Sequence, residues 1–373
     1  MDPALRPIID RIRAAAAAGT PLRIRGGGTK DFYGERLVGE VLDTAPLAGI
    51  TSYEPSELVV TVRAGTPLAT LEAALADKGQ CLPFEPPHFA PGGTVGGMVA
   101  AGLSGPARAT AGSVRDYVLG LSMVNGRAEH LTFGGQVMKN VAGYDVSRLM
   151  AGSLGTLGLI TEVSLKVLPV APAEATLRFT LDEAGAIRQL NQWAGQPLPL
   201  NASSWVVDAG QPVLYLRLRG AVAAVEAACQ RLLHDLPGER MDSAATRADW
   251  AAARDLRLPW FADGLARGQD LWRLSVAPTA PPLGVGDTFV EWLGGQRWVW
   301  ADPADAGAAT RLRSAAAAHG GHATLFIVAH ADSARAAARF TPLAGALARI
   351  HRELQRQFDP AGIFNPGRLL TPA

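Results

Sequence analysis

The feature that most constrains this chain is a glycine-rich run in its first third, Pro91-Gly92-Gly93-Thr94-Val95-Gly96-Gly97. Small residues follow from Met98 to Gly102, so the backbone here has little side-chain cover. A segment of this kind can approach a ligand closely and present N–H groups to it, as in proteins that hold a pyrophosphate. The sequence therefore predicts an anion-binding loop at the centre of the region from Phe84 to Pro169.

Two further glycine clusters flank this run. One, Gly26-Gly27-Gly28-Thr29-Lys30, follows a predicted strand at 21–25, and the other is Gly152-Ser153-Leu154-Gly155-Thr156-Leu157-Gly158. The first is neither a Walker loop nor a Rossmann fingerprint, because Asp31 stands where the third fingerprint glycine should fall. Taken alone, the first cluster is as typical of an ordinary glycine turn as of an anion-binding loop. The spacing of the glycines at 152, 155 and 158 alone is more typical of two backbones that cross closely. Three clusters in one domain favour a long cofactor with phosphate groups that lies across several loops.

The composition limits the classes of function. At 373 residues the chain is long enough for two domains, and 48% hydrophobic with 18% charged residues is typical of a globular protein. The net charge of +1 argues against a protein that binds nucleic acid through bulk electrostatics. Two cysteines, Cys81 and Cys229, are too few to hold an iron–sulfur cluster. If electrons leave this protein for such a cluster, we expect the cluster to lie in another chain.

The first residues predict an amphipathic helix that ends at Gly19, and no secretory leader. Charged residues occur throughout residues 1–13, and the alanine run at 14–18 is too short for the apolar core of a signal peptide. No stretch approaches 18 uninterrupted apolar residues, so we expect no membrane-spanning helix. The expected location is the cytoplasm, with at most a peripheral position at the inner membrane.

Stretches rich in valine and leucine, separated by turn residues, predict the elements of the first domain. The expected strands are 21–25, 37–42, 58–62, 118–124, 130–133 and a long alternating strand that contains 162–167. The expected helices are 68–77, which begins after Pro67, and 146–150. The pair Asn125-Gly126 between two strands is a strong hairpin signal.

A change of composition at 169–172 marks the predicted domain boundary. Beyond it, strand candidates alternate with alanine-rich helices near 183–194, 221–235 and 304–318. The strands are 175–179, 205–207, 213–218, 272–276, 297–301 and 324–328. This pattern predicts an antiparallel sheet backed by helices, and the whole chain is assigned to the α+β class.

Histidines are the obvious candidates for catalysis or metal binding. His88 lies in a proline-rich loop beside the central glycine run, where packing or hydrogen bonding is a commoner role than catalysis. His319, His322 and His330 are the densest group of metal-capable side chains, but no H-E-x-x-H pattern or carboxylate cluster accompanies them. We therefore predict no metal site and assign no catalytic residue.

Together, the glycine clusters and the C-terminal stretch resemble the FAD-linked oxidase family, which is built on the vanillyl-alcohol-oxidase (PCMH) type of FAD-binding domain. The matching pieces are Arg25-Gly26-Gly27-Gly28-Thr29, Thr94-Val95-Gly96-Gly97, Gly112-Ser113-Val114-Arg115-Asp116, Gly143-Tyr144-Asp145, Gly155-Thr156-Leu157-Gly158 and Phe364-Asn365-Pro366-Gly367-Arg368. Within the family, the stretches 84–89, 104–106, 134–145 and 321–326 resemble the FAD-binding subunits of bacterial glycolate oxidases, also called glycolate dehydrogenases.

The resemblance implies an architecture and a cofactor. Residues 1–170 would form an FAD-binding domain of two α/β subdomains, 171–335 a smaller antiparallel-sheet cap domain over the isoalloxazine, and 336–373 a tail that returns to the FAD domain. The pyrophosphate would lie on 26–30 and 92–97, the ribityl chain and flavin along 102–116, and the adenosine and flavin edge at 155–163. Covalently flavinylated relatives carry a histidine or cysteine in the first glycine loop, which this chain lacks, so FAD is expected to bind non-covalently.

The residues that the resemblance assigns to the cofactor site are Arg25, Gly26, Gly27, Gly28, Thr29, Lys30, Pro91, Gly92, Gly93, Thr94, Val95, Gly96, Gly97, Ala101, Gly102, Ser104, Gly105, Gly112, Arg115, Asp116, Gly155, Thr156, Gly158, Ile160 and Asn365. Of these, Asn365 is expected to face the flavin ring.

The resemblance also implies a role and partners. The chain would be the FAD-binding subunit of a multi-subunit glycolate oxidase, together with a catalytic flavoprotein subunit and an iron–sulfur subunit, and the complex would oxidise a small 2-hydroxy acid. Two alternatives stay open: a self-sufficient flavin-dependent D-2-hydroxy acid dehydrogenase, and a non-catalytic subunit in which FAD is a structural ligand or is missing. Hydride transfer needs a base and a carboxylate anchor. Arg108 and Arg217 are candidates for the anchor, and no base stands out.

Overall fold

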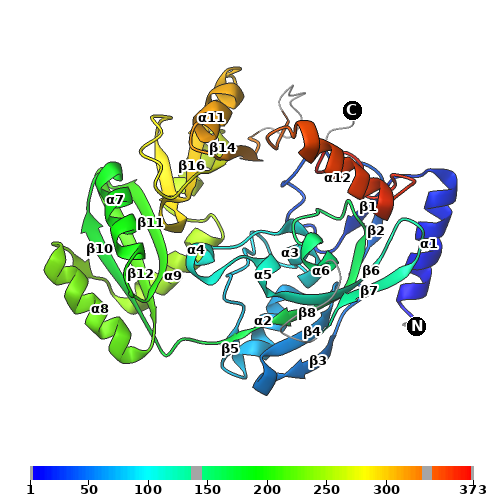
Figure 1. The fold of residues 1–373 in the computed structure, drawn as a ribbon, viewed down its shortest axis with the longest axis horizontal. Coiled ribbons are helices and arrows are strands. Elements are labelled where there is room, and N and C mark those ends of the chain that lie inside the picture. Colours follow the sequence, from blue (N-terminus) through cyan, green and yellow to red (C-terminus); the bar gives the residue numbers. More distant parts are fainter. Residues whose placement is uncertain (1–2, 136–144, 330–337, 371–373) are drawn as a thin grey trace. The chain divides into compact units, whose positions relative to one another are not determined.

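The computed structural model describes residues 3–135, 145–329 and 338–370. Within it the chain divides into two compact units, whose elements Figure 1 labels. Unit 1 contains Met1–Leu103, Ser113–Pro169 and Pro342–Ala373, and unit 2 contains Ser104–Gly112 and Val170–Thr341. The segment 104–112 therefore leaves unit 1 and returns to it.

Unit 1 begins with a small layer of one helix on two strands. Helix α1 (Leu5–Ala18) ends at Gly19, which adopts the left-handed conformation, as the sequence predicts. Its apolar face packs on the parallel pair β1 (Leu22–Arg25) and β2 (Glu40–Asp43). Ile363 and Phe364 complete this core from the C-terminal end of the chain. Strand β2 begins at Glu40, later than the sequence indicates, because its pairing with β1 starts at Leu22 and Glu40.

The second part of unit 1 is a five-stranded antiparallel sheet. Its order is β3 (Ile50–Glu54), β4 (Val59–Arg63), β8 (Leu159–Lys166), β6 (Val118–Val124) and β7 (His130–Gly134). The predicted hairpin of β6 and β7 is confirmed, and Asn125 Oδ1 accepts hydrogen bonds from the backbone N–H groups of Arg127 and Glu129 in its turn. Strands β5 (Gln80–Cys81) and β9 (Leu168–Pro169) form a separate, two-stranded antiparallel sheet.

The helices of unit 1 contribute to the core of this sheet. They are α2 (Leu68–Ala76), α3 (Val95–Ala101), α5 (Val114–Tyr117), α6 (Val146–Leu149) and α12 (Gly345–Phe358), with a 3-10 turn at Pro55–Glu57. Helix α3 lies inside the glycine run that the sequence alone describes as a bare loop. It begins there because the Thr94 hydroxyl accepts a 3.2 Å hydrogen bond from the N–H of Gly97 and caps the first turn.

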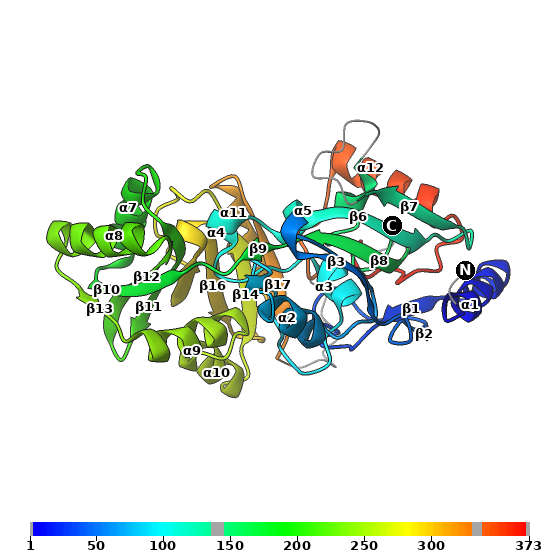
Figure 2. The same cartoon turned by 90° about the horizontal axis from the view of Figure 1, so that it is seen from below.

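Unit 2 is built on an eight-stranded antiparallel sheet of order β13-β10-β12-β11-β15-β16-β14-β17. The strands are β10 (Ala173–Thr180), β11 (Leu200–Asp208), β12 (Gln211–Gly220), β13 (Glu239–Arg240), β14 (Asp270–Ser275), β15 (Thr288–Glu291), β16 (Gln296–Ala301) and β17 (His322–Ile327). The helices are α4 (Arg108–Ala111), α7 (Glu183–Ala194), α8 (Val222–Asp235), α9 (Ser243–Arg254), α10 (Pro259–Ala266) and α11 (Ala308–Ala317), with a 3-10 turn at Trp292–Gly294. Figure 2 shows α7 and α8 on one side of the strands and α9 and α10 on the other. The predicted antiparallel sheet and three alanine-rich helices are confirmed, and α4, α9, α10, β13 and β15 are additional.

Segment 104–112 belongs to unit 2 because of specific contacts. Trp292 Nε1 donates a 3.0 Å hydrogen bond to the carbonyl of Gly105, and the Thr110 hydroxyl donates to the carbonyl of Asn201 at 2.7 Å. In the described part of the chain, every helix is too short or too polar to cross a lipid bilayer.

Candidate cofactor site

Two glycine loops of unit 1 pack directly against each other. The loop at 26–30 leaves the end of β1, and the loop at 91–94 leads into α3. A Cβ atom at Gly27 would overlap the carbonyl oxygen of Gly92, far inside the 3.0 Å below which real Cβ atoms do not approach. A Cβ atom at Gly26 would overlap the hydroxyl of Thr94 in the same way. Only glycine fits at these two positions, and segments far apart in the sequence share one surface.

The two loops present N–H groups that no protein acceptor uses. Within residues 3–135, 145–329 and 338–370, the N–H groups at 26–28 and at 92–93 donate no hydrogen bond to another protein group. Gly28, with a φ of 70°, and Gly92, with a φ of 88°, adopt left-handed conformations that turn successive peptide groups toward one side. Such a concave set of N–H groups suits a phosphate oxygen.

The rest of the central run has a different role. The N–H of Val95 donates to the carbonyl of Thr66, and that of Gly96 donates to the carbonyl of Ala64 at 2.7 Å. Gly96 is also in close contact with this alanine, because an added Cβ would lie 2.6 Å from the Cβ of Ala64. Gly96 therefore lets α3 approach the residue that follows β4, while Pro91 and Gly92 form the exposed end of the loop.

Side-chain charge near the first loop is largely paired within the loop. Arg25 Nε donates to Asp31 Oδ2 at 2.8 Å, and its guanidinium lies where a side chain on Gly28 would be. Lys30 Nζ lies 5.7 Å from the centre of the Phe89 ring. Thr29 Oγ1 would be 3.2 Å from a Cβ atom on Gly93. The side chains of Thr29 and Lys30 therefore lie next to Gly93 of the second loop, and that of Arg25 lies over Gly28 of the first.

The third glycine cluster joins the same site through a small cavity. Residues from all three clusters line it, and its volume is about 70 Å³. The lining residues are Ile24, Gly26, Thr44, Ala64, Gly96, Gly97, Ala100, Leu154, Gly155, Gly158, Ile160 and Asn365. Gly158 is required for packing, since a Cβ atom there would overlap the methyl group of Met123. The Thr156 hydroxyl is buried and donates to the carbonyl of Ser153 at 2.8 Å.

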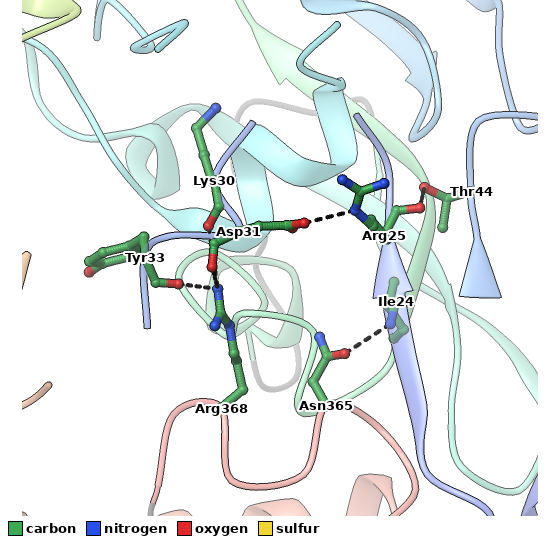
Figure 3. A network of polar contacts seen from close by, with 8 residues as sticks. All are labelled: Ile24, Arg25, Lys30, Asp31, Tyr33, Thr44, Asn365 and Arg368. Atoms are coloured by element: carbon green, nitrogen blue, oxygen red, sulfur yellow. Dashed lines mark hydrogen bonds and ion pairs between the residues drawn. The ribbon is translucent and has the colours of Figure 1, made fainter. Parts of the chain in front are cut away.

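The C-terminal tail forms hydrogen bonds with the segments that carry the first and third glycine clusters (Figure 3). Asn365 Oδ1 accepts from the N–H of Ile24 at 2.8 Å, and Asn365 Nδ2 donates to the carbonyl of Leu154 at 2.6 Å. Both ends of the amide are therefore engaged with the strand before the first loop and with the third glycine cluster. A φ of 41° at Asn365 aims the side chain between them.

Arg368 holds the segment that follows the first glycine loop. Its side chain is buried, and its guanidinium donates to the backbone carbonyls of Lys30, Asp31, Tyr33 and Glu35. A fully charged group that satisfies several carbonyls at once makes strong hydrogen bonds. Sequence reasoning placed Arg368 in a family motif without a role, and nothing in its local sequence reveals four acceptors so far away in the chain.

The site residues between 101 and 116 lie along the exit from α3. Gly102 ends that helix with a φ of 66°, and an added Cβ would lie 2.7 Å from the Cα of Gly152. Ala101 is buried at the last turn. Of the residues predicted from here on, Ser104, Gly105 and Gly112 belong to unit 2, and Arg115 and Asp116 belong to unit 1.

Asp116 has a structural partner in α5. Its Oδ2 accepts from both the N–H and the hydroxyl of Ser113 at 2.8 Å, which forms a capping box. Burial alone would raise the pKa of Asp116, but these hydrogen bonds and the charges of Arg115 and Arg148 lower it below its ordinary value. Asp116 is therefore a carboxylate that orders the start of α5.

His88, His319 and His322 have partners or positions outside the set of predicted cofactor residues. His88 Nε2 lies 2.8 Å from Glu72 Oε2 on α2, so its role is the hydrogen bonding that the sequence favours. His322 opens β17, His319 precedes it, and His330 lies outside the described residues. Among the described residues, no three histidine, cysteine or acidic side chains lie close enough together to hold a metal ion.

The two arginines proposed as substrate anchors have partners inside unit 2. The Arg108 guanidinium lies 4.5 Å from the ring centre of Trp292. Arg217 is buried, donates from Nε to Asn201 Oδ1 at 2.6 Å, and stacks on Trp250 at 4.8 Å. The sequence analysis did not assign Thr44, Ala64 and Leu154, which line the small cavity of unit 1, to the cofactor site. The pair of small residues Ala64-Gly65 after a predicted strand was an available signal, because such pairs allow two backbones to approach closely.

Comparisons with known proteins point to the same cofactor. Residues 6–145 match the family described as "FAD binding domain". The chain is 41% identical over 363 residues to glycolate oxidase subunit GlcE of Escherichia coli strain K12, which covers 97% of this chain and 96% of that protein. Glycolate oxidase subunit GlcD of Bacillus subtilis strain 168 is 32% identical over 171 residues, which covers 45% of this chain and 36% of that protein.

The fold has solved counterparts. A crystal form of alkyldihydroxyacetonephosphate synthase superposes with a TM-score of 0.68 at 15% identity, over 97% of this chain and 74% of that one. At this identity the likeness concerns the fold alone. Because the glycine loops, the fold and an identity of 41% across nearly the full length agree, the chain belongs to the FAD-linked oxidases with a PCMH-type FAD-binding domain, and its cofactor is FAD.

Proposed function

We propose that unit 1 binds FAD non-covalently, with the pyrophosphate on the paired loops at 26–30 and 91–94. The observation that carries this proposal is the contact of Gly27 with Gly92, which brings two sets of unused N–H groups to one surface. Backbone N–H groups in left-handed turns stabilise phosphate charge without a lysine. The cationic side chains at this surface are Lys30 and Arg25, and Arg25 is paired with Asp31, so the backbone N–H groups add positive potential beside them.

The same proposal assigns the cavity to another part of the cofactor. Its volume of about 70 Å³ is far below the roughly 300–1,000 Å³ of a complete small-molecule site, so it suits one portion of FAD. Gly155, Gly158 and Ile160 line it, and Asn365 closes one side. Ala101, Gly102, Arg115 and Asp116 then belong to the ribityl and flavin side of the site. The role of Asn365 is to hold two loops in register as well as to border the cofactor.

We further propose that the chain is the FAD-binding subunit of a multi-subunit glycolate oxidase. Its similarity to the Escherichia coli subunit spans both units, so the cap as well as the FAD domain is shared. The partners are a catalytic flavoprotein subunit and an iron–sulfur subunit, and the complex oxidises glycolate to glyoxylate. Bound FAD supplies two-electron acceptance and one-electron release, and the residues of this chain bind and orient it. Arg108 and Arg217 are engaged with Trp292 and Asn201, which favours an electron-relay role over hydride transfer at this flavin.

The test is the absorbance spectrum of the purified chain. We expect a yellow protein that releases free FAD on denaturation, as non-covalent binding requires. Glycolate or D-lactate added to the chain alone should leave the flavin oxidised, whereas glycolate together with the partner subunits should bleach it. Bleaching by substrate without partners would establish the self-sufficient dehydrogenase instead. A flavin that stays oxidised in the assembled, active complex would establish a structural role. A chain that takes up no flavin even with its partners would refute the proposal.

A further inference from the structure

Unit 2 contains a second cavity, far larger than the one in unit 1, that the proposed function leaves without a role. Its volume is about 610 Å³, which lies within the usual range for small-molecule sites. It is enclosed by α9 and α10 on one side and by the facing strands β11, β12 and β15 on the other. Figure 2 shows these two helices together on one face of the sheet. The whole cavity therefore belongs to unit 2.

The deep part of the cavity is aromatic. Trp250 on α9 and Phe289 on β15 are buried, and Trp260 on α10 has its ring centre 5.5 Å from that of Phe289. Trp250 is fixed in place because its Nε1 donates to the hydroxyl of Thr176 at 3.0 Å. Flat, rigid rings of this kind provide a contact surface for an apolar or aromatic body.

One polar group in this deep part has no protein partner. Ser204 on β11 lines the cavity and is 4% exposed, and its hydroxyl makes no hydrogen bond to any residue that the structure describes. Val206, two residues along the strand, lines the cavity as well, so the alternation of β11 places both side chains on the cavity face. The Ser204 hydroxyl therefore faces the cavity, where a polar atom on a ligand can form a hydrogen bond with it.

The mouth of the cavity is acidic. The exposed carboxylates that line it are Asp208, Asp249, Asp263 and Asp287, and Arg267 is the cation among the lining residues. Two further cations lie against the wall, Arg178 at Tyr215 and Arg217 over the ring of Trp250. Tyr215 donates its hydroxyl to Asp208 at 2.6 Å, and Trp260 Nε1 donates to Asp287 at 2.9 Å. These two carboxylates are thus oriented by aromatic side chains of the wall. This excess of negative charge repels the anion of a 2-hydroxy acid and attracts a cation.

We propose that the cavity of unit 2 binds an amphipathic organic cation. Its aromatic or aliphatic body lies against Trp250 and Phe289, its ammonium group lies at the acidic mouth beside Trp260, and a hydroxyl-type group on the body meets Ser204. Carboxylates and an indole face together favour an ammonium group, by charge and by cation–π attraction. The site is separate from the proposed FAD site and does not depend on the proposed function.

Three matched probes test this assignment by isothermal titration calorimetry on the full-length protein. Tyramine carries an ammonium, a phenyl ring and a phenol hydroxyl, phenethylamine lacks the hydroxyl, and 4-hydroxyphenylacetate replaces the ammonium by a carboxylate. We expect tyramine to bind about five-fold more tightly than phenethylamine, because of one additional hydrogen bond. The carboxylate probe and glycolate should not bind.

Variants assign the binding to this cavity. Ser204→Ala should remove the advantage of tyramine over phenethylamine and leave phenethylamine unchanged. The double substitution of Asp249→Asn with Asp263→Asn should weaken both amines about ten-fold, since two charges at the mouth are lost. Asp235→Asn, an exposed position at the end of α8 outside the cavity, is the matched control and should leave all affinities unchanged. Ser204→Ala keeps the shape of the wall, so its effect does not depend on a folding defect.

Three results would overturn the proposal: no saturable amine binding, equal binding of 4-hydroxyphenylacetate, or affinities that the cavity variants do not change. The assembled complex should bind tyramine as well as the single chain does. Loss of binding on assembly would show that a protein segment fills the cavity, which would also overturn it.

Discussion

The two cavities of this protein are made in opposite ways. In unit 1 the site exists because side chains are missing, and at Gly26 and Gly27 even a methyl group would overlap a neighbouring loop. In unit 2 the site exists because large side chains are present, with Trp250, Trp260 and Phe289 as its walls. Substitutions that add atoms at the glycines should therefore weaken binding in unit 1. Substitutions that truncate the aromatic side chains should weaken binding in unit 2.

Gly27→Ala should have the largest effect of the substitutions that test this contrast between the two sites. One methyl group must displace the carbonyl of Gly92, so we expect FAD affinity to fall at least about a hundred-fold and unit 1 to lose about 3 kcal/mol of stability. The measurement is the ratio of bound flavin to protein after gel filtration, with circular dichroism as the check on folding. Gly195→Ala is the control, because Gly195 has a φ of −80° and an added Cβ meets its nearest atom at 3.7 Å. A folded Gly27→Ala protein with full flavin content would contradict the proposed site.

Arg368→Ala should have the next largest effect, and it should be confined to unit 1. The change leaves several buried carbonyls after the first glycine loop without their donor, which costs about 3 kcal/mol. Differential scanning calorimetry should show a lower transition for unit 1 and an unchanged transition for unit 2. Arg349→Ala, at an exposed position of α12, serves as the control and should leave both transitions in place. Equal shifts in both units would show that the tail stabilises more than the loops that it contacts.

Gly264→Ala applies the same test to unit 2. Gly264 of α10 lies on the ring of Trp300, and a Cβ atom there would overlap the indole. We expect α10 to move away from the sheet at a cost of about 1–3 kcal/mol, with a loss of amine binding and normal flavin content. Calorimetry and flavin content measured on the same sample would check this. Loss of flavin in this variant would show that the two sites are coupled.

The smallest effect concerns the pH dependence of stability at Asp359. Burial raises the pKa of this carboxyl above its ordinary value of 3.8, although backbone N–H groups of residues 362–364 oppose the shift. The folded state then binds its proton more tightly than the unfolded state does. The stability contribution is therefore complete below the ordinary pKa and is lost as the pH rises through the folded pKa.

Asp359→Asn should accordingly flatten the fall in the stability of unit 1 as the pH rises above the ordinary carboxyl pKa of 3.8 and through the raised folded pKa. Urea unfolding at several pH values gives the comparison, with the exposed Asp10→Asn as the control. Parallel pH profiles for the wild type and Asp359→Asn would contradict the predicted direction.

Local patterns predicted much of the fold. Helix α1 with its Gly19 end, the hairpin at Asn125 and the alternating strand around Val163 all follow from neighbours in the sequence. Helix α3 did not, because glycines disfavour helices, and here the cap from Thr94 and the contact of Gly96 with Ala64 decide the conformation. In α9, a cap by Asp242 was a visible signal that the sequence analysis left unused.

The cofactor site likewise has features that the sequence reveals and features that only the fold reveals. Its glycines stand out in the sequence because their composition is unusual, and the resemblance to a family grouped them. The contact of Gly27 with Gly92 and the carbonyl partners of Arg368 depend on long-range packing, which no local pattern encodes. The acidic mouth of the cavity in unit 2 comes from separate strands and helices, so its carboxylates are visible together only in the folded chain.

The position of Asn365 also affects how the protein is made. Its side chain and backbone form hydrogen bonds with β1, in which Ile24 stands 341 residues earlier, so the first layer of unit 1 is complete only after residue 365 has left the ribosome. Until then, β1 lacks the hydrogen bonds that it forms with Asn365. A polypeptide that stops before Asn365 lacks these hydrogen bonds and should bind less flavin than one that contains it.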